Sequence, residues 1–113
     1  MILRWQDLAR TKKKDEDHHY RMIDLKPFRI VLHEYGSGWQ TEWHEHEASQ
    51  LSFVLEGEMV VDTGEEVVKH EAGQGLYFSG WSGHQNSSPS RETVALSLYF
   101  RPQRAEDREA TGS

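Results

Sequence analysis

The sequence of 113 residues contains no cysteine. Disulfide bonds, thiolate metal ligands and cysteine nucleophiles are therefore all excluded. Long apolar runs are missing too: no stretch approaches the length of a membrane span, and the first residues, MILRWQDLARTKKK, lack the apolar core of a signal peptide. We therefore expect a cytoplasmic protein with no membrane partner.

Positive charge is also scarce. Lys and Arg number 13 against 19 Asp and Glu, which gives a net charge of -6, and no basic cluster is flanked by aromatic residues. Proteins that bind nucleic acid show the opposite balance, so we expect no nucleic-acid partner. The length suits a single domain with a modest core.

No segment keeps a helical period, whereas short apolar stretches alternate with turn signals at intervals of about ten residues. This pattern predicts an all-β sandwich or barrel, with strands at 20–23, 28–35, 50–55, 58–62, 65–70, 76–78 and 93–100. We expect an N-terminal segment over 1–19, in which 11–19 is a charged, solvated loop. A barrel over 20–100 and a flexible tail over 101–113 complete the prediction.

Two histidines separated by one residue lie in the stretch 36–57, GSGWQTEWHEHEASQLSFVLEG. In an extended strand, His44 and His46 project from the same face and can chelate one ion. Gln50 follows a short irregular step and can return its amide oxygen to the same point. His84, in the stretch GQGLYFSGWSGHQN, is the best-placed fourth ligand. Imidazole with oxygen donors suits a divalent transition metal: zinc, nickel, iron, manganese or cobalt.

These two stretches resemble the two motifs of the cupin superfamily. In the first, Gln50 stands where glutamate is commoner; in the second, Ser79 and Trp81 stand where proline and glycine are usual. The resemblance covers roughly residues 20–100 and is that of a small single-domain type-2 cupin. It implies a double-stranded β-helix, or jelly-roll barrel, with the four side chains named above as metal ligands.

Within the superfamily, the chain is most similar to the small cupins that linearise unsaturated uronates in pectin and alginate breakdown. It shares their Trp-x-Asp-Leu start, their three-histidine-plus-glutamine site and their closing Phe-x-Pro-x-Arg, here Phe100 to Arg104. This resemblance makes Phe100 and Arg104 candidate substrate-binding residues. An aspartate two residues before the phenylalanine takes part in catalysis in that family, and Leu98, which cannot exchange a proton, stands there.

Other side chains are weaker candidates. Trp81 and Tyr99 are core or rim aromatics, or else they form the wall of a pocket for a ring-shaped ligand. The candidate proton carriers are His33, Tyr99 and Glu42. Glu42 is included because it shares the strand parity of His44 and His46. The remaining histidines are expected to be structural or surface residues, namely His18, His19 and His70.

Neutral ligands would leave a bound cation its full positive charge, and so a strong ability to polarise a substrate oxygen. Because protons compete for the histidines, we expect metal loss below about pH 6. Three functions stay open: a metal-dependent enzyme acting on a sugar acid or polyketide-like phenol, a dioxygenase with a redox-active metal, or a non-catalytic protein that binds or senses a small ligand.

Strand parity also predicts an apolar outer surface. If Gln50 points into the barrel, Ser52 and Val54 follow it, and Leu51, Phe53 and Leu55 face outward. Such a surface needs a cover. We therefore expect either a homodimer or a cap formed by the N-terminal segment.

Overall fold

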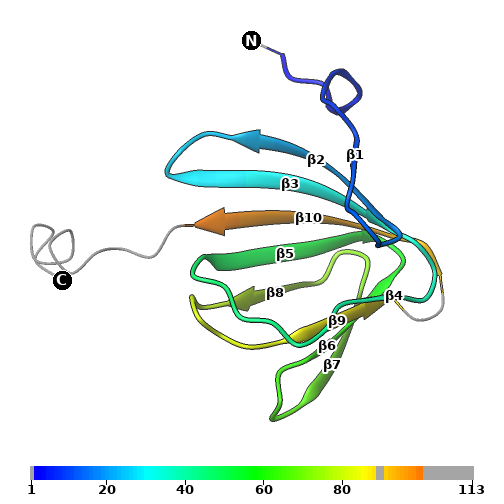
Figure 1. Ribbon diagram of the computed structural model, residues 1–113, viewed down its shortest axis with the longest axis vertical. Helices are drawn as coiled ribbons and strands as arrows, with labels where there is room; N and C mark the ends of the chain where they lie inside the picture. Colours follow the sequence, from blue (N-terminus) through cyan, green and yellow to red (C-terminus); the bar gives the residue numbers. More distant parts are fainter. Residues whose placement is uncertain (1, 89–90, 101–113) are drawn as a thin grey trace, which may run out of the picture.

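The computed structural model describes residues 2–88 and 91–100. It contains a 3-10 helix and ten strands: η1 (Trp5–Asp7), β1 (Thr11–Lys12), β2 (His18–Asp24), β3 (Phe28–Tyr35), β4 (Trp39–Gln40), β5 (Ser49–Glu56), β6 (Glu58–Asp62), β7 (Val67–Glu71), β8 (Gly75–Phe78), β9 (Gln85–Ser88) and β10 (Thr93–Phe100). The strands form a six-stranded sheet, β1-β2-β3-β10-β5-β8, and a four-stranded sheet, β4-β9-β6-β7 (Figure 1). All pairings are antiparallel, and the predicted all-β jelly roll is confirmed.

Some polar stretches form strands that the sequence pattern did not predict. The segment expected as a charged loop over 11–19 is a hairpin instead, in which β1 pairs with the start of β2. Strands β4 and β9 pair with each other in the smaller sheet, and neither was predicted. These strands are short and lack alternating apolar residues, which are the signal that sequence analysis relies on.

The interior of the molecule has an apolar part and a polar part. The apolar core is formed by buried side chains from both sheets: Tyr35, Trp39, Val54, Met59, Val61, Phe78 and Ala95. The polar part is equally buried and includes His18, His33, Gln50, His84 and Ser97. Polar groups removed from water need hydrogen-bond or metal partners, so the polar part is where a site is expected.

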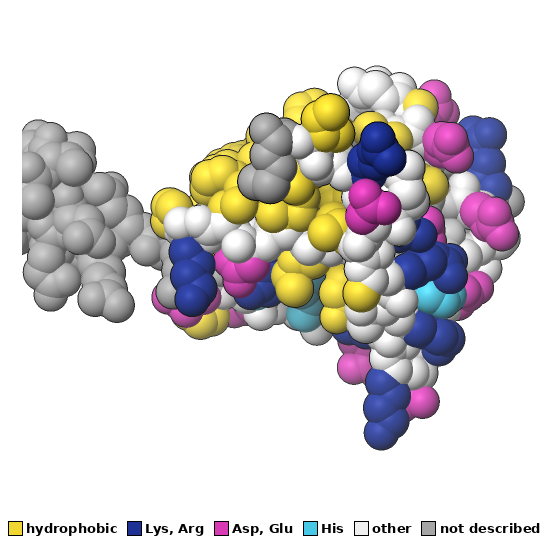
Figure 2. Space-filling view, turned by 90° about the horizontal axis from the view of Figure 1, so that it is seen from above, with side chains coloured by type: hydrophobic (Ala, Val, Ile, Leu, Met, Phe, Trp, Pro, Cys, Tyr) yellow, Lys and Arg dark blue, Asp and Glu magenta, His cyan; other side chains and the backbone are white. Residues whose placement is uncertain are grey.

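The outer face of the six-stranded sheet is apolar, as strand parity predicted. Val54 is buried, whereas Phe53 and Leu55 are 40% and 47% exposed. One row across five neighbouring strands consists of apolar residues in register: Ile23, Ile30, Leu98, Leu51 and Tyr77. Viewed from above, the molecule shows hydrophobic side chains gathered in one broad area (Figure 2).

Over residues 2–10, the N-terminal segment meets this face at β2 and β3, where Arg21 and Glu34 share the outward parity of Ile23 and Ile30, but it leaves Phe53 and Leu55 uncovered. It is attached near the edge of the sheet, where Arg21 Nη1 donates to the carbonyl oxygen of Trp5 at 2.8 Å and Arg10 pairs with Glu34 at 2.6 Å. Phe53 and Leu55 stay exposed. Of the two covers expected, the N-terminal cap is therefore wrong for the described residues, and the homodimer stays a prediction.

Within residues 2–88 and 91–100, no helix has the length and apolar character needed to cross a bilayer. The flexible tail predicted over 101–113, together with Arg104, lies outside the described residues.

Candidate metal centre

Three histidines from two separate loops meet in the polar interior. His44 and His46 lie between β4 and β5, and His84 lies just before β9. The backbones of His44 and His84 form an antiparallel bridge, with each amide N–H donating to the other carbonyl at 3.0 Å. One ligand atom from each of the three imidazoles lies within 4.8 Å of the others. The structure therefore brings together the three histidines that the sequence predicted as ligands.

All three imidazoles are oriented in the same way. Their Nδ1 atoms lie 3.1, 2.8 and 3.2 Å from the backbone carbonyl oxygens of Glu42, Ala48 and Ser82, respectively. A carbonyl only accepts, so each Nδ1 must carry the proton and donate. In the neutral ring Nε2 then has a free lone pair. This outer set of hydrogen bonds is the arrangement that orients histidine ligands around a metal ion.

Gln50 joins the cluster from the start of β5. Its Oε1 lies 3.1 Å from Nε2 of His46, and its Nε2 donates to the Ser52 hydroxyl at 2.7 Å. Two lone-pair atoms facing each other repel unless a cation lies between them. Two ligand atoms about 2.1 Å from one ion, at a right angle, are themselves about 3.0 Å apart. The contact has the separation expected of neighbouring ligands.

His84 supplies the most direct sign that a cation fits here. Its side chain is fully buried, and its Nε2 has no hydrogen-bond partner among the described residues. Burial lowers the pKa of His84 to about 4, and the neighbouring His44 and His46 act in the same direction. A buried imidazole that is held neutral and has an unused lone pair suits a metal ligand.

Two cavities lead to this cluster. One, of about 710 Å³, is lined by His44, His46, Gln50 and Tyr99 and by the hairpin that precedes β2. The other, of about 600 Å³, shares His46 and Tyr99 and includes Arg29. Both volumes lie in the range of sites for small molecules.

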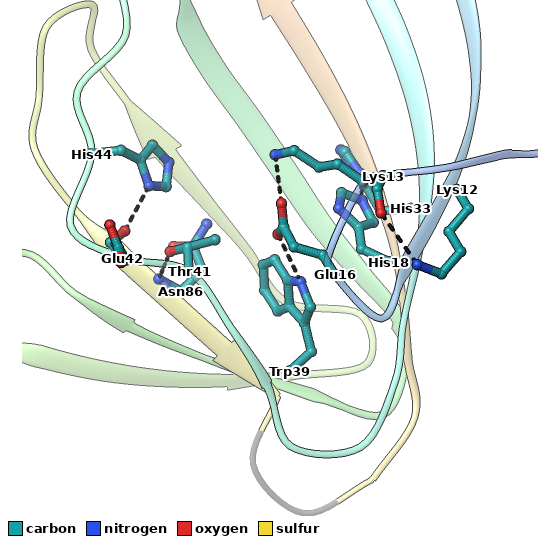
Figure 3. A network of polar contacts seen from close by, with 10 residues as sticks. All are labelled: Lys12, Lys13, Glu16, His18, His33, Trp39, Thr41, Glu42, His44 and Asn86. Carbon is teal, nitrogen blue, oxygen red and sulfur yellow. Dashed lines mark hydrogen bonds and ion pairs between the residues drawn. The ribbon is translucent and has the colours of Figure 1, made fainter.

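The hairpin between β1 and β2 forms one wall of the larger cavity. Lys13 pairs with Glu16 at 3.4 Å, and the indole N–H of Trp39 donates to Glu16 at 3.2 Å (Figure 3). This wall was not predicted because a run of charged residues is usually solvated.

A chain of polar side chains lies beside the histidine cluster. His18 Nε2 is 2.8 Å from His33 Nδ1, and His33 Nε2 is 2.9 Å from the Tyr99 hydroxyl. Burial lowers the pKa of His18 to about 4 and that of His33 to about 3, and it raises the pKa of Tyr99 to about 12. All three groups are therefore neutral near pH 7. His18 was expected to be structural or at the surface, yet it lines the larger cavity.

The other predicted site residues are only partly brought together. Glu42 is exposed at the rim of the larger cavity, where its carbonyl oxygen holds His44. Phe100 lines the second cavity and packs against Phe28. Trp81 is 64% exposed and lines neither of the two cavities.

The structure shows where two departures from the expected patterns lie: Trp81, from the second cupin motif, and Leu98, from the uronate-linearising cupins. Trp81 has a φ of 65°, a left-handed conformation that glycine adopts more easily, and its backbone N–H donates to the carbonyl oxygen of His46 at 2.8 Å. Leu98 lies in the apolar outer row, between Ile30 and Leu51. Its neighbours Ser97 and Tyr99 lie on the opposite, inward face of β10.

His19 and His70 lie apart from the cluster, in line with the prediction. His19 pairs with Lys12 in the β1–β2 hairpin, and His70 is buried in the smaller sheet opposite Met59. Neither residue lines the two cavities that reach the histidine cluster.

Comparison with known proteins agrees with this architecture. The family model described as "Cupin domain" matches residues 31–99. An RmlC-like cupin from Shewanella frigidimarina superposes with a TM-score of 0.76 at 19% identity, with 89% of each chain covered. The polyketide cyclase RemF from Streptomyces resistomycificus superposes with a TM-score of 0.76 at 14% identity, with 100% of this chain and 93% of the RemF chain covered. KdgF from Halomonas sp. superposes with a TM-score of 0.76 at 16% identity, with 89% of this chain and 92% of KdgF covered. No curated protein matches the sequence significantly.

Proposed function

The chain belongs to the cupin family, and from this premise we propose that it is an enzyme that uses a divalent cation to polarise an oxygen atom of a small substrate. The observation that carries the proposal is the shared orientation of His44, His46 and His84, whose Nδ1 atoms are all engaged by carbonyl oxygens. The amide oxygen of Gln50 would be the fourth ligand. A structural histidine cluster would have no need to leave the buried Nε2 of His84 without a partner.

When bound, a divalent cation supplies a Lewis acid for a carbonyl or hydroxyl oxygen. The four side chains are neutral, so they leave the positive charge of the ion uncompensated. Gln50 is held by Ser52, and Ser52 lies 2.7 Å from Ser97, so the amide is fixed by hydrogen bonds on the side away from the cavity. Such support keeps ligands in place during turnover.

We propose a sugar acid or a polyketide-like phenol as the substrate. Support comes from the volume and polar lining of the larger cavity, from the resemblance to uronate-linearising cupins and from the fold shared with a polyketide cyclase. Because Leu98 lies on the outer face, the proton carrier must differ from the catalytic aspartate of the uronate enzymes. In our proposal the proton carriers are Tyr99, which lines both cavities, and His33, which is hydrogen-bonded to Tyr99.

One observation favours a second function, that of a non-catalytic ligand-binding cupin. No carboxylate from β3, β5 or β10 lines the larger cavity in the part of the chain that the structure describes. A binding protein needs no strong base there. Binding and turnover should both be measured on a panel of uronates and phenols. Binding without turnover favours the binding protein, and turnover favours the enzyme. We keep the cytoplasm as the proposed location.

Metal content is the first test. Protein purified without a histidine tag should contain about one equivalent of a transition metal by elemental mass spectrometry, and dialysis below about pH 6 should remove it. His84→Ala should abolish binding, whereas His19→Ala, which removes an imidazole outside the site, should not. A metal-free wild type that is not stabilised by any added divalent metal would refute the proposal. A redox-active metal with oxygen consumption would favour the dioxygenase.

A further inference from the structure

The chain from His18 to Tyr99 runs across three neighbouring strands toward the metal centre. His18 is on β2, His33 on β3 and Tyr99 on β10, and their side chains are joined at 2.8 and 2.9 Å. Tyr99 is paired in register with Gln50 on β5, and its ring lies edge-on to that of His46, with centroids 6.2 Å apart. The Tyr99 end of the chain therefore faces the cavity, and the His18 end lies at the hairpin.

The direction of the hydrogen bonds in this chain is determined by its far end. Nδ1 of His18 is buried and has no hydrogen-bond partner among the described residues. If Tyr99 donated to His33 and His33 to His18, the proton of His18 would lie on this Nδ1 as a buried, unpaired N–H. Such groups are rare in native proteins.

The opposite direction avoids this penalty. His18 then carries its proton on Nε2 and donates it to Nδ1 of His33, and only a lone pair is left at Nδ1 of His18. The positive charge of Lys13 acts on His18 more strongly than the negative charge of Glu16, and it favours a lone pair there. Each neutral imidazole ring carries one N–H proton. His33 accepts at Nδ1, so its proton must lie on Nε2, which donates to the Tyr99 oxygen.

We infer that Tyr99 presents its hydroxyl proton to the cavity as a fixed donor, and that it recognises an acceptor oxygen on the same small molecule whose other oxygen binds the cation. This inference rests on the proposed function, which it narrows to ligands with two oxygens placed to chelate. Arg29 lines the second cavity with Tyr99, but it is paired there with Asp24 at 3.2 Å. The ligand class is therefore set by the cation and Tyr99: a small molecule with two neighbouring oxygens, as in a hydroxy or keto carboxylate.

The tautomers are tested in the metal-free protein, without any assay of activity. Long-range ¹H–¹⁵N correlation spectra near pH 7 distinguish a protonated from a lone-pair ring nitrogen. We expect both His18 and His33 to be protonated at Nε2. A proton on Nδ1 of His33 would overturn the inference, whether or not the protein binds metal.

The recognition step is tested with Tyr99→Phe, which removes the hydroxyl and keeps the ring. On zinc-loaded protein, we expect the affinity for glycolate to fall about tenfold, while zinc content stays unchanged. Tyr77→Phe, on the exposed outer face, is the matched control. Imidazole, which binds zinc but offers Tyr99 no acceptor oxygen, should bind both proteins equally. Unchanged glycolate affinity in Tyr99→Phe would overturn the inference, whereas a wild type that takes up no divalent metal at all would refute the proposed function.

Discussion

The indole ring of Trp43 packs against Gly83 so closely that a Cβ atom on Gly83 would lie 2.5 Å from the ring. Each of these two residues directly precedes one of the bridged histidines, His44 and His84. The contact therefore fixes the distance between the two loops that hold the proposed ligands.

From this contact we expect Gly83→Ala to weaken metal binding and to destabilise the fold by about 1–3 kcal/mol, the usual cost of overpacking. Chelator competition and denaturant unfolding measure the two effects. In a Trp43→Ala background the added methyl group has room, so the second substitution should cost much less there. Equal costs in both backgrounds would show that the contact does not hold the loops.

The clustering of His44, His46 and Gln50 was predictable because its signal is local. The spacing of His44, His46 and Gln50 places three donors within a few residues of one another, and a short strand or bridge is enough to bring them together. The outward direction of Phe53 and Leu55 was predictable for a similar reason, since side chains alternate strictly along a strand.

The rest of the site depends on contacts between distant segments. His18 lies in a run of charged residues and becomes part of the cavity only because the β1–β2 hairpin folds beside His33. The left-handed backbone of Trp81 likewise depends on a hydrogen bond to His46. Neither arrangement leaves a periodic pattern in the sequence.

The apolar outer face of the six-stranded sheet leads us to expect a homodimer. Its central row is apolar across five strands, and two such faces related by a two-fold axis would pack as sheet on sheet. Sedimentation should give twice the 13.2 kDa of one chain. Phe53→Glu should shift the protein to monomer, whereas Val67→Glu, at an exposed apolar position of the smaller sheet, should not. A wild type of single mass at all concentrations would contradict this prediction.

The charge of the fourth ligand determines the balance between metal affinity and Lewis acidity. Gln50→Glu adds a negative charge beside the cation, so we expect metal affinity to rise about tenfold and polarisation of the substrate to weaken. Chelator competition measures the affinity, and kcat measures the polarisation. Gln6→Glu, in η1, adds the same charge away from the cavities and should change neither. Unchanged affinity in Gln50→Glu would indicate that Gln50 is not a ligand.

Acid should destabilise the metal-free protein through its buried histidines, among them the pair His18 and His33. In the unfolded chain both take up a proton near pH 6.5, whereas burial holds their folded pKa values at about 4 and about 3. Below pH 6.5 the unfolded state therefore binds more protons. The contribution of the two histidines to the free energy of unfolding is fully present above about pH 6.5. It is lost as the pH falls toward their folded-state pKa values, at up to about 1.4 kcal/mol per pH unit for each histidine.

Denaturant unfolding between pH 7.5 and 4.5 measures this slope. His33→Gln removes one of the histidines with a lowered pKa, so its unfolding free energy should fall less steeply with acid, even if its stability at neutral pH is lower. His19→Gln removes an imidazole from outside the buried pair and serves as the matched control. A wild type whose unfolding free energy stays constant from pH 6.5 to 4.5 would mean that His18 and His33 are charged in the folded state, which would also remove the basis for the inferred direction of the chain to Tyr99.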